Sequence, residues 1–297
     1  MASQKSVTCF GYVSPGLVFA VEKYPEANSG AYVSAKHPFI GADCAMAART
    51  LARWGVQAHL IANALGDDIV GQRAMEQLTG EGVHAHFALR RDVRTPEEVD
   101  VIDRAGTRTF FVDNTTVWDT LSEADLSPIQ HASLLYVDWY VGQPARDAVA
   151  MAHAHNVPVY LNVEYSLRQP DKYFDLVSQA TYVQSAINDS ASQASKTEDP
   201  RALARALCNA GAQMAFVTRG KFGALALQGQ TAVDVPAMDI NVMDAQGAGA
   251  TFSAAAMYGL LQGWPLERIT RFATRAASLK CQKFGLLTMR PEEILVE

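Results

Sequence analysis

The sequence predicts an α/β protein: a central sheet covered by helices on both faces, with a small β lid beside it. From position 43 onward, short β-like runs alternate with helix-like segments, a pattern typical of parallel sheets. The 297-residue length suits one large domain or a core domain with a small appendage, and the hydrophobic share of 49% allows a full core. Two β-rich excursions interrupt the alternation and predict the additional sheet.

The N-terminal part begins with strand-like runs. Residues 7–13 are apolar and end at the turn signal Ser14-Pro15-Gly16. Residues 17–21 and 31–34 are predicted short strands, separated by the polar stretch 22–30, which contains Pro and Gly. They form the first excursion, a hairpin set apart from the core.

Helix formers run from Asp43 to Gly55, a residue suited to the position after a helix, so Gly41 and Ala42 lie in the loop that enters this helix. A second β excursion follows at 97–103 and 107–113, around the turn Arg104-Ala105-Gly106. The other expected strands are 58–62, 83–88, 134–138, 157–163, 182–184, 214–218, 223–227 and 231–235. The expected helices are 70–78, 145–155, 171–178, 201–210, 250–261 and 266–283.

The loop 244–249 is the most informative stretch for function. Gly247, Ala248 and Gly249 stand directly before a helix, so several free backbone N–H groups can point outward at the positive end of the helix dipole. Such a loop can hold an anion. The alternative is a tight turn that serves packing alone.

Composition excludes several classes of protein. Lys plus Arg is 25 and Asp plus Glu is 31, giving a net charge of −6 without a basic cluster, so nucleic acid is not an expected partner. No apolar run approaches the roughly 20 residues of a membrane helix, and the first residues lack the features of a signal peptide. The four cysteines are scattered without metal-site spacing. We expect a cytoplasmic protein with reduced thiols and no membrane partner.

Several motifs, in order along the chain, resemble those of the ribokinase-like (PfkB) carbohydrate kinases. The segment 244–252, Asp-Ala-Gln-Gly-Ala-Gly-Ala-Thr-Phe, is similar to the family signature D-T-x-G-A-G-D-[TS]-F. Gly41 with its helix, Gly66-Asp67-Asp68 with Gly71, and the stretch 217–224 resemble further family landmarks. Within the family, the segments 162–165 and 278–281 look most like ketohexokinase and the bacterial sulfofructose kinases.

The resemblance implies a three-layer α/β/α core of residues 1–13, 39–94 and 115–297, with a β lid of residues 14–38 and 95–114. It implies ATP and magnesium as cofactors and a small sugar bound between lid and core. The backbone amides of Gly247, Ala248, Gly249 and Ala250 would stabilise the transferred phosphoryl group. The nucleotide would lie near Ser185, Thr218, Gly220, Gly223, Asp244, Gly247 and Gly249.

The chain departs from the family at the catalytic position. Ala250 stands where the family has the Asp that acts as general base, and a methyl group cannot accept the proton of a sugar hydroxyl. We therefore expect the chain to be nearly inactive. We interpret Ala250 as an engineered Asp-to-Ala change, with a natural pseudokinase as the alternative.

The sugar-contacting positions depart as well. Gly16 and Met46 stand where the family commonly has Asp and Asn. By resemblance, Gly41, Asp43 and Arg108 are further candidates for substrate binding, Arg108 for a polar or anionic substituent. Asp43 is alternatively an N-cap of its helix, and Arg108 alternatively a solvated strand charge. These departures point away from an ordinary hexose or ribose.

Asp244 resembles the residue that helps many family members organise a monovalent cation such as K⁺; the alternative is an Asx residue that stabilises the turn. Ser185 begins Ser-Ala-Ile-Asn, which replaces the family's N-x-x-E near the metal, so phosphates and water would hold most of the magnesium.

The leading hypothesis is an ATP-dependent kinase of a ketose or a modified sugar. A sugar- or nucleotide-binding regulator without activity is the rival, and a nucleoside kinase is a third reading. Because open lid strands offer sheet edges for pairing, we expect a homodimer through the lid.

Overall fold

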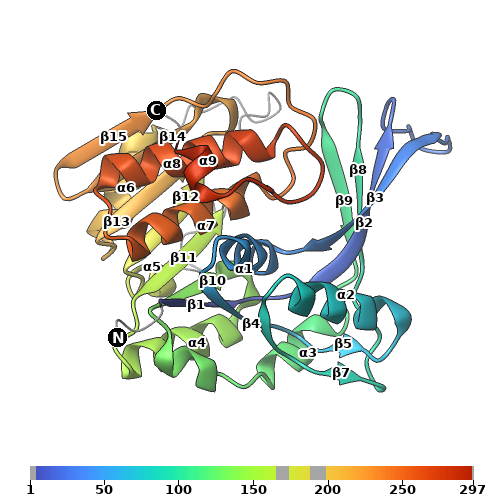
Figure 1. The fold of residues 1–297 in the computed structure, drawn as a ribbon, viewed down its shortest axis with the longest axis horizontal. Coiled ribbons are helices and arrows are strands. Elements are labelled where there is room, and N and C mark those ends of the chain that lie inside the picture. The colour runs from blue at the N-terminus through green and yellow to red at the C-terminus, as the bar shows by residue number, and fades with distance from the viewer. Residues whose placement is uncertain (1–4, 165–173, 188–198, 296–297) are drawn as a thin grey trace.

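A nine-stranded sheet forms the centre of the computed structural model, which describes residues 5–164, 174–187 and 199–295 (Figure 1). The strand order is β15-β14-β13-β12-β11-β10-β1-β4-β6. The bounds are β1 Ser6–Phe10, β4 Gln57–Ile61, β6 His84–His86, β10 Leu134–Asp138, β11 Val159–Glu164, β12 Tyr182–Ala186, β13 Met214–Thr218, β14 Ala224–Gln228 and β15 Thr231–Val235.

This sheet is mixed, whereas the alternating pattern predicts a parallel one. Neighbouring strands from β6 to β13 are parallel, but β14 pairs antiparallel with both β13 and β15. The links on either side of β14 are short turns, and parallel neighbours would need a crossover of a dozen residues or more. The prediction of a parallel sheet, made from the helix–strand units that end at residue 218, is confirmed for those strands and does not extend to β14 and β15.

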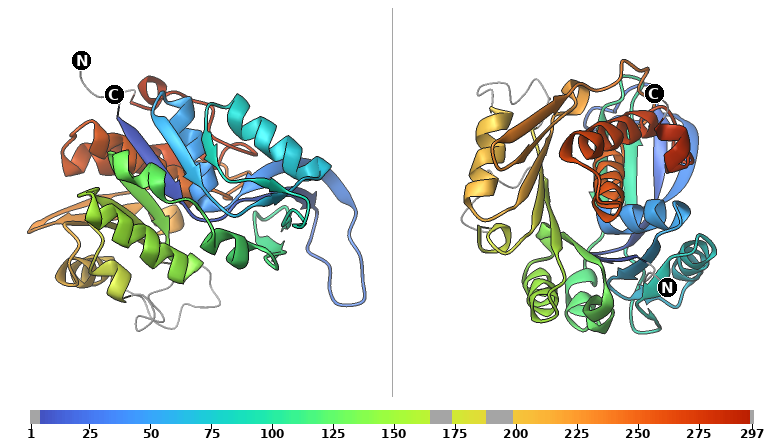
Figure 2. Two further views of the ribbon diagram at one scale, coloured as in Figure 1. Left: turned by 90° about the horizontal axis from the view of Figure 1, so that it is seen from below. Right: turned by 60° about the vertical axis from the view of Figure 1, so that its left-hand side comes forward.

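Helices cover both faces of the sheet and confirm the three-layer prediction (Figure 2). One hydrophobic cluster joins α1, α7 and α8 to one face, and a second joins α4 and α6 to the other. The bounds are α1 Asp43–Arg53, α2 Ile69–Gly80, α3 Val117–Ser122, α4 Gln143–Ala154, α5 Phe174–Val177, α6 Pro200–Asn209, α7 Ala248–Leu261, α8 Leu266–Lys280 and α9 Pro291–Ile294. The start of the helix expected at 171–178 lies outside the described residues. Among the described residues, no helix has the length and apolar character that a membrane crossing requires.

A four-stranded sheet projects from the core and is called the lid sheet below (Figures 1 and 2). Its order is β3-β2-β8-β9, with β2 Ser14–Val21, β3 Val33–Gly41, β8 Glu98–Ile102 and β9 Arg108–Val112. β2 and β8 run parallel, so the two excursions, distant in sequence, become one sheet. β3 is longer than the predicted strand at 31–34 and leads directly into α1. A two-stranded sheet, β5 Leu65–Gly66 with β7 Leu89–Arg90, lies beside α2.

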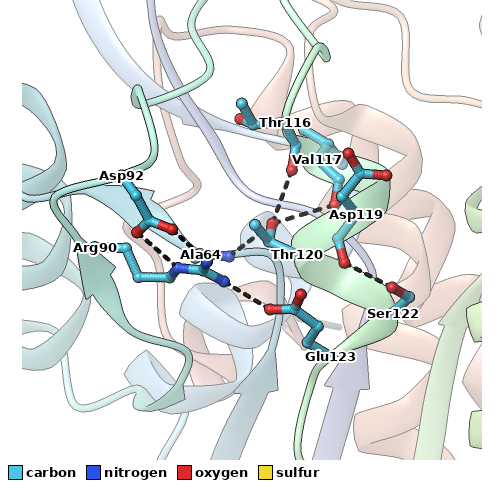
Figure 3. Close-up of polar contacts among 9 residues, drawn as sticks. All are labelled: Ala64, Arg90, Asp92, Thr116, Val117, Asp119, Thr120, Ser122 and Glu123. Carbon is cyan, nitrogen blue, oxygen red and sulfur yellow. Dashed lines mark hydrogen bonds and ion pairs between the residues drawn. The ribbon is translucent and has the colours of Figure 1, made fainter.

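The chain returns from the lid sheet to the core through α3, which polar contacts hold in place (Figure 3). The Thr120 hydroxyl accepts a hydrogen bond from the Ala64 amide at 3.2 Å and donates to the Thr116 carbonyl at 2.9 Å. Arg90 makes ion pairs with Asp92 and Glu123, each at 2.6 Å. The base of the lid sheet is thereby joined to the β5–β7 region of the core.

Candidate active site

The small-residue loop before α7 has the backbone geometry of an anion-binding turn. Gly247 is the N-cap of α7 and has φ of 71°, in the left-handed region that favours glycine. Gln184, on β12, donates its side-chain N–H to the Gly249 carbonyl at 3.3 Å, and Ser253 donates to the Gln184 side-chain oxygen at 2.8 Å. These bonds fix the first turn of α7, whose amides have few partners inside the helix, against the carboxyl end of the sheet.

Ala250 is fully buried, in an apolar environment. It belongs to a small hydrophobic cluster between the lid sheet and the core, whose other buried members are Val18, Phe39, Met46 and Ile102. Met46 also covers Gly247: a Cβ at Gly247 would lie 2.5 Å from the Met46 sulfur. The positions that the family resemblance assigns to base and sugar contact, 250 and 46, thus belong to the same apolar cluster here.

Asp43 is the first residue of α1 and not its N-cap, so that alternative from the sequence is wrong. The N-cap is Ala42, which has a φ of 71° and cannot cap through its side chain. Asp138, at the end of β10, accepts a hydrogen bond from the Cys44 amide at 3.0 Å and so satisfies the start of the helix from outside. The hydroxyls of Tyr136 and Tyr140 also donate to Asp138, at 2.7 and 3.0 Å.

The Asp43 side chain is free of capping and faces β11 and α7. Asn162 on β11 donates its side-chain N–H to Asp43 Oδ2 at 3.0 Å, and a further hydrogen bond links Asp43 with Glu164. Asp43 Oδ2 lies 4.0 Å from the point where a Cβ on Gly249 would be. Glu164 has a φ of 44°, a strained conformation of the kind concentrated at functional sites.

Burial dominates the electrostatics of these acids. It raises the pKa of Asp43, an effect opposed by the Glu164 hydrogen bond and by the charge of Arg108. Burial and the neighbouring charge of Asp43 raise the pKa of Glu164 well above its usual range. The same causes raise the pKa of Asp138 to about 7, against its hydroxyl and amide donors. The hydrogen bond between the two side chains lowers the pKa of Asp43 and raises that of Glu164.

The lid sheet adds a second group of acids and Arg108. Arg108 on β9 pairs with the buried Asp100 on β8 at 3.3 Å and lies over the Phe110 ring. The Ser14 hydroxyl donates to Glu98 at 3.1 Å, and burial, with the charge of Asp100, raises the pKa of Glu98 to about 8. Arg108 is thus an exposed strand residue whose guanidinium pairs with a buried carboxylate, and its charge lowers the pKa of Asp43.

Two glycines predicted to contact substrate are required by close packing. A Cβ at Gly16 would lie 2.2 Å from the Glu98 carbonyl oxygen, and one at Gly41 would lie 2.8 Å from the Glu98 carboxylate. Here strands β2 and β8 approach closely beside Phe39. A small cavity between β3, α1 and the loop before α7 measures about 40 Å³, room for about one water molecule.

The Asp244 carboxylate forms an ion pair with a lysine of the same chain. The Lys280 ammonium, 2% exposed, lies 2.8 Å from Asp244 Oδ2 and 2.9 Å from the Asp244 carbonyl oxygen. The Gln246 amide donates to Asp244 Oδ1 at 2.8 Å, which is the Asx turn that the sequence left as an alternative. Among the described residues no group of three or more His, Cys, Asp or Glu side chains is placed to hold a metal ion.

The residues predicted to lie near the nucleotide follow β12 and β13. Ser185 is buried on β12, and Thr218 ends β13 and donates to the Ser185 carbonyl at 3.3 Å. Gly220 begins a 3₁₀ turn, Gly220–Phe222, and Gly223 follows with φ of 87°. A Cβ at Gly223 would lie 2.0 Å from the Val235 carbonyl oxygen. Beyond that contact is a cavity of about 570 Å³ between α8 and the segment 235–238.

Comparison with known proteins decides the family. A model of the pfkB family of carbohydrate kinases matches residues 4–293. The chain belongs to this family. Ribokinase from Bacillus subtilis (strain 168) is 25% identical over 285 residues, 95% of this chain and 94% of that protein.

Solved structures confirm the ribokinase-like fold of this pfkB-family chain. Arabidopsis thaliana ribokinase, complexed with ribose and ATP, superposes with a TM-score of 0.75 at 19% identity, covering 98% of this chain and 97% of that one. A nucleoside kinase from Burkholderia thailandensis, in complex with inosine, gives a TM-score of 0.79 at 17% identity, covering 97% and 95%.

Sequence reasoning missed several polar residues of this pfkB-family cleft. Asp138 and Glu98 carry no local motif, and their contacts with α1 and Ser14 span 94 and 84 residues. Lys280 stands within a segment noted only for family likeness, although a lysine in the otherwise uncharged inner face of a helix is a signal of a buried partner. Gln184 was also missed, because it stood only as the last residue of the predicted strand 182–184.

Proposed function

We propose that this chain transfers the γ-phosphoryl group of ATP to a hydroxyl of a small sugar, a ketose or a modified sugar, bound between the lid sheet and the core. One observation carries the proposal: the first turn of α7, with left-handed Gly247, opens beside the Asp43 carboxylate. Anion-binding amides next to a proton acceptor are the two elements that phosphoryl transfer needs.

The site residues support this assignment on the nucleotide side. A cavity of about 570 Å³ is within the range of small-molecule sites, and it adjoins Gly223. We assign it to the nucleotide base, with Ser185, Thr218 and Gly220 toward the sugar and phosphates. Magnesium would be held by phosphates and water, because Ser185 offers no carboxylate.

Filling this cavity is expected to weaken nucleotide binding. Met238 lines the cavity, and Met238→Trp puts a larger ring into the space assigned to the base. We expect the Kd for Mg-ATP, measured by titration calorimetry, to rise at least about tenfold, or about 1.4 kcal/mol. Met243→Trp is the matched control, since Met243 is 48% exposed and does not line the cavity. Equal affinities in the two variants would contradict the assignment.

We further propose that the protein is indifferent to K⁺. Lys280 places a positive charge on Asp244, and Gln246 occupies the other carboxylate oxygen. Thermal stability and Mg-ATP affinity are therefore expected to be equal in KCl, NaCl and choline chloride at matched ionic strength. A rise in both quantities that is specific to KCl would show that an external cation still binds beside the loop.

A nucleoside is the second candidate acceptor, favoured by an aromatic group near the cleft. Tyr12 makes edge contacts with Trp118 and Tyr140, with ring centroids 6.4 and 5.5 Å apart, and Trp118 is 40% exposed. The nucleoside kinase of similar fold was solved with inosine.

The expected homodimer stays a prediction. Phe110 and Phe111 on β9 are exposed, which is compatible with a dimer formed through the lid sheet.

The test of the proposed function has two parts. Calorimetry is expected to show Mg-ATP binding to the chain, because backbone amides supply the phosphate contacts. Phosphoryl transfer is then measured for the chain and for Ala250→Asp, with ketohexoses, ribose and adenosine as acceptors. Absence of ATP binding, or of transfer by both proteins, would contradict a kinase and favour the regulator hypothesis.

The apolar packing around Ala250 favours a natural alanine over an engineered one. The engineered origin of Ala250 stays a prediction.

A further inference from the structure

Position 250 offers no base, so the proton of the acceptor must go elsewhere if the proposed transfer occurs. Ala250 is fully buried in an apolar cluster with Met46 and residues of the lid sheet, and its methyl group cannot accept a proton. Acidic side chains around the start of α1 come from that helix, β10 and β11. They are Asp43, Asp138 and Glu164.

Asp43 is better placed than Asp138. Asp138 is fully buried, and the two tyrosine hydroxyls and the Cys44 amide occupy its oxygens. A Cβ built on Gly249, in the first turn of α7, would lie 4.0 Å from Asp43 Oδ2. Asp43 is also partly exposed, so an acceptor can reach it.

The surroundings of Asp43 hold its carboxylate toward the phosphate loop. Asp138 accepts the hydrogen bond from the Cys44 amide at the start of α1, so the Asp43 side chain does not have to cap that helix. Asn162 holds Oδ2 at 3.0 Å, and Glu164, strained at the end of β11, binds the same side chain. Burial raises the pKa of Asp43, which brings its basicity closer to that required near neutral pH.

We propose that Asp43 is the general base of this chain and takes the role that residue 250 has in the family, with Glu164 as a positioning residue. The inference rests on the proposed function. The acceptor O–H bond breaks and its proton passes to Asp43. The acceptor oxygen bonds to the γ-phosphorus, while the bond from that phosphorus to the β–γ bridging oxygen breaks and its electron pair leaves with ADP.

The test compares four proteins: the chain, Asp43→Asn, Ala250→Asp and the double variant. Transfer of labelled phosphate from Mg-ATP to ketohexoses, ribose and adenosine is measured, with Mg-ATP affinity and thermal stability as parallel readouts. Asp43→Asn is expected to lower kcat at least about 10²-fold, with Mg-ATP affinity unchanged. The double variant is expected to recover most of the loss, because a carboxylate returns to the same cleft from α7. Asp147→Asn, an exposed change on α4, is the control.

A second measurement covers the case in which Asp43→Asn folds poorly. In Asp43→Ala, added formate is expected to restore part of the transfer rate, since a free carboxylate can enter the space left by the side chain, whereas chloride at the same ionic strength does not. Rescue by formate identifies a missing base, because a merely structural defect would not respond to it. Absence of rescue in a folded variant counts against the proposal.

The outcomes separate this inference from the proposed function. If Ala250→Asp is active and the chain itself is not, or if Asp43→Asn keeps the rate of the chain, the kinase assignment stands and Asp43 is not the base. The same conclusion follows if Ala250→Asp alone raises the rate about 10²-fold, as expected from the sequence. If neither the chain nor Ala250→Asp transfers phosphate to any acceptor, both the proposed function and this inference fail.

Discussion

Lys280→Ala is expected to lower the free energy of unfolding by about 3–5 kcal/mol. Lys280 and Asp244 are 2% and 1% exposed and lie 2.8 Å apart, so removing the ammonium leaves an uncompensated carboxylate in the interior. The pair joins the end of α8 to the loop that begins the phosphate-binding turn. Urea denaturation of the chain and the variant measures the loss.

Two controls make this result specific. Lys283→Ala removes an exposed lysine three residues further along and is expected to change stability little. The double variant Lys280→Met with Asp244→Asn removes both charges, so its loss is expected to be clearly smaller than the sum of the losses in Lys280→Met and in Asp244→Asn, each made alone. Strictly additive losses, or a Lys280→Ala variant as stable as the chain, would contradict a coupled buried pair.

Gly223→Ala is expected to lower stability by about 2–5 kcal/mol, the combined cost of left-handed strain and overpacking. The residue has a φ of 87°, and a Cβ would lie 2.0 Å from the Val235 carbonyl oxygen and 2.5 Å from the Ala237 amide nitrogen. Because both are backbone atoms, the loop itself must shift. Mg-ATP affinity is expected to fall with it, since this loop borders the cavity assigned to the base.

Gly229→Ala supplies the matched comparison. Gly229 also has a positive φ, of 57°, but a Cβ there would meet nothing within 4 Å. We expect it to cost only about 1–2 kcal/mol and to leave Mg-ATP affinity unchanged. Equal melting temperatures and affinities for the two variants would show that the close approach at Gly223 is relieved without cost.

Local signals predicted most of the architecture. Strand Leu134–Asp138 has the predicted bounds, and the lid hairpin turns at Gly106, which has a φ of 79° as a glycine turn allows. The direction of β14 and β15 was not predicted, because runs of apolar residues carry no information on strand direction. Direction there is set by the short turns, which apolar periodicity does not reveal.

The candidate site was predictable only where a motif is contiguous. The loop Gly247–Ala248–Gly249 was found because its small residues adjoin their helix. The role of Asp43 was ambiguous, because an acid at the start of a helix suits both capping and catalysis, and only the position of Asp138 across the sheet separates the two. Lys280 and Asp244 are 36 residues apart, and folding alone brings them together.

Transfer of the γ-phosphoryl group distinguishes a kinase that uses Asp43 from a protein that only binds sugar or nucleotide. The chain is incubated with Mg-ATP labelled at the γ-phosphate and with each ketohexose, ribose and adenosine in turn, and label is counted in the acceptor and matched to ADP formed. We expect label in at least one acceptor, in equal amount to ADP, and its loss in Asp43→Asn. Label that remains in ATP with every acceptor, in the chain and in Ala250→Asp alike, would contradict it.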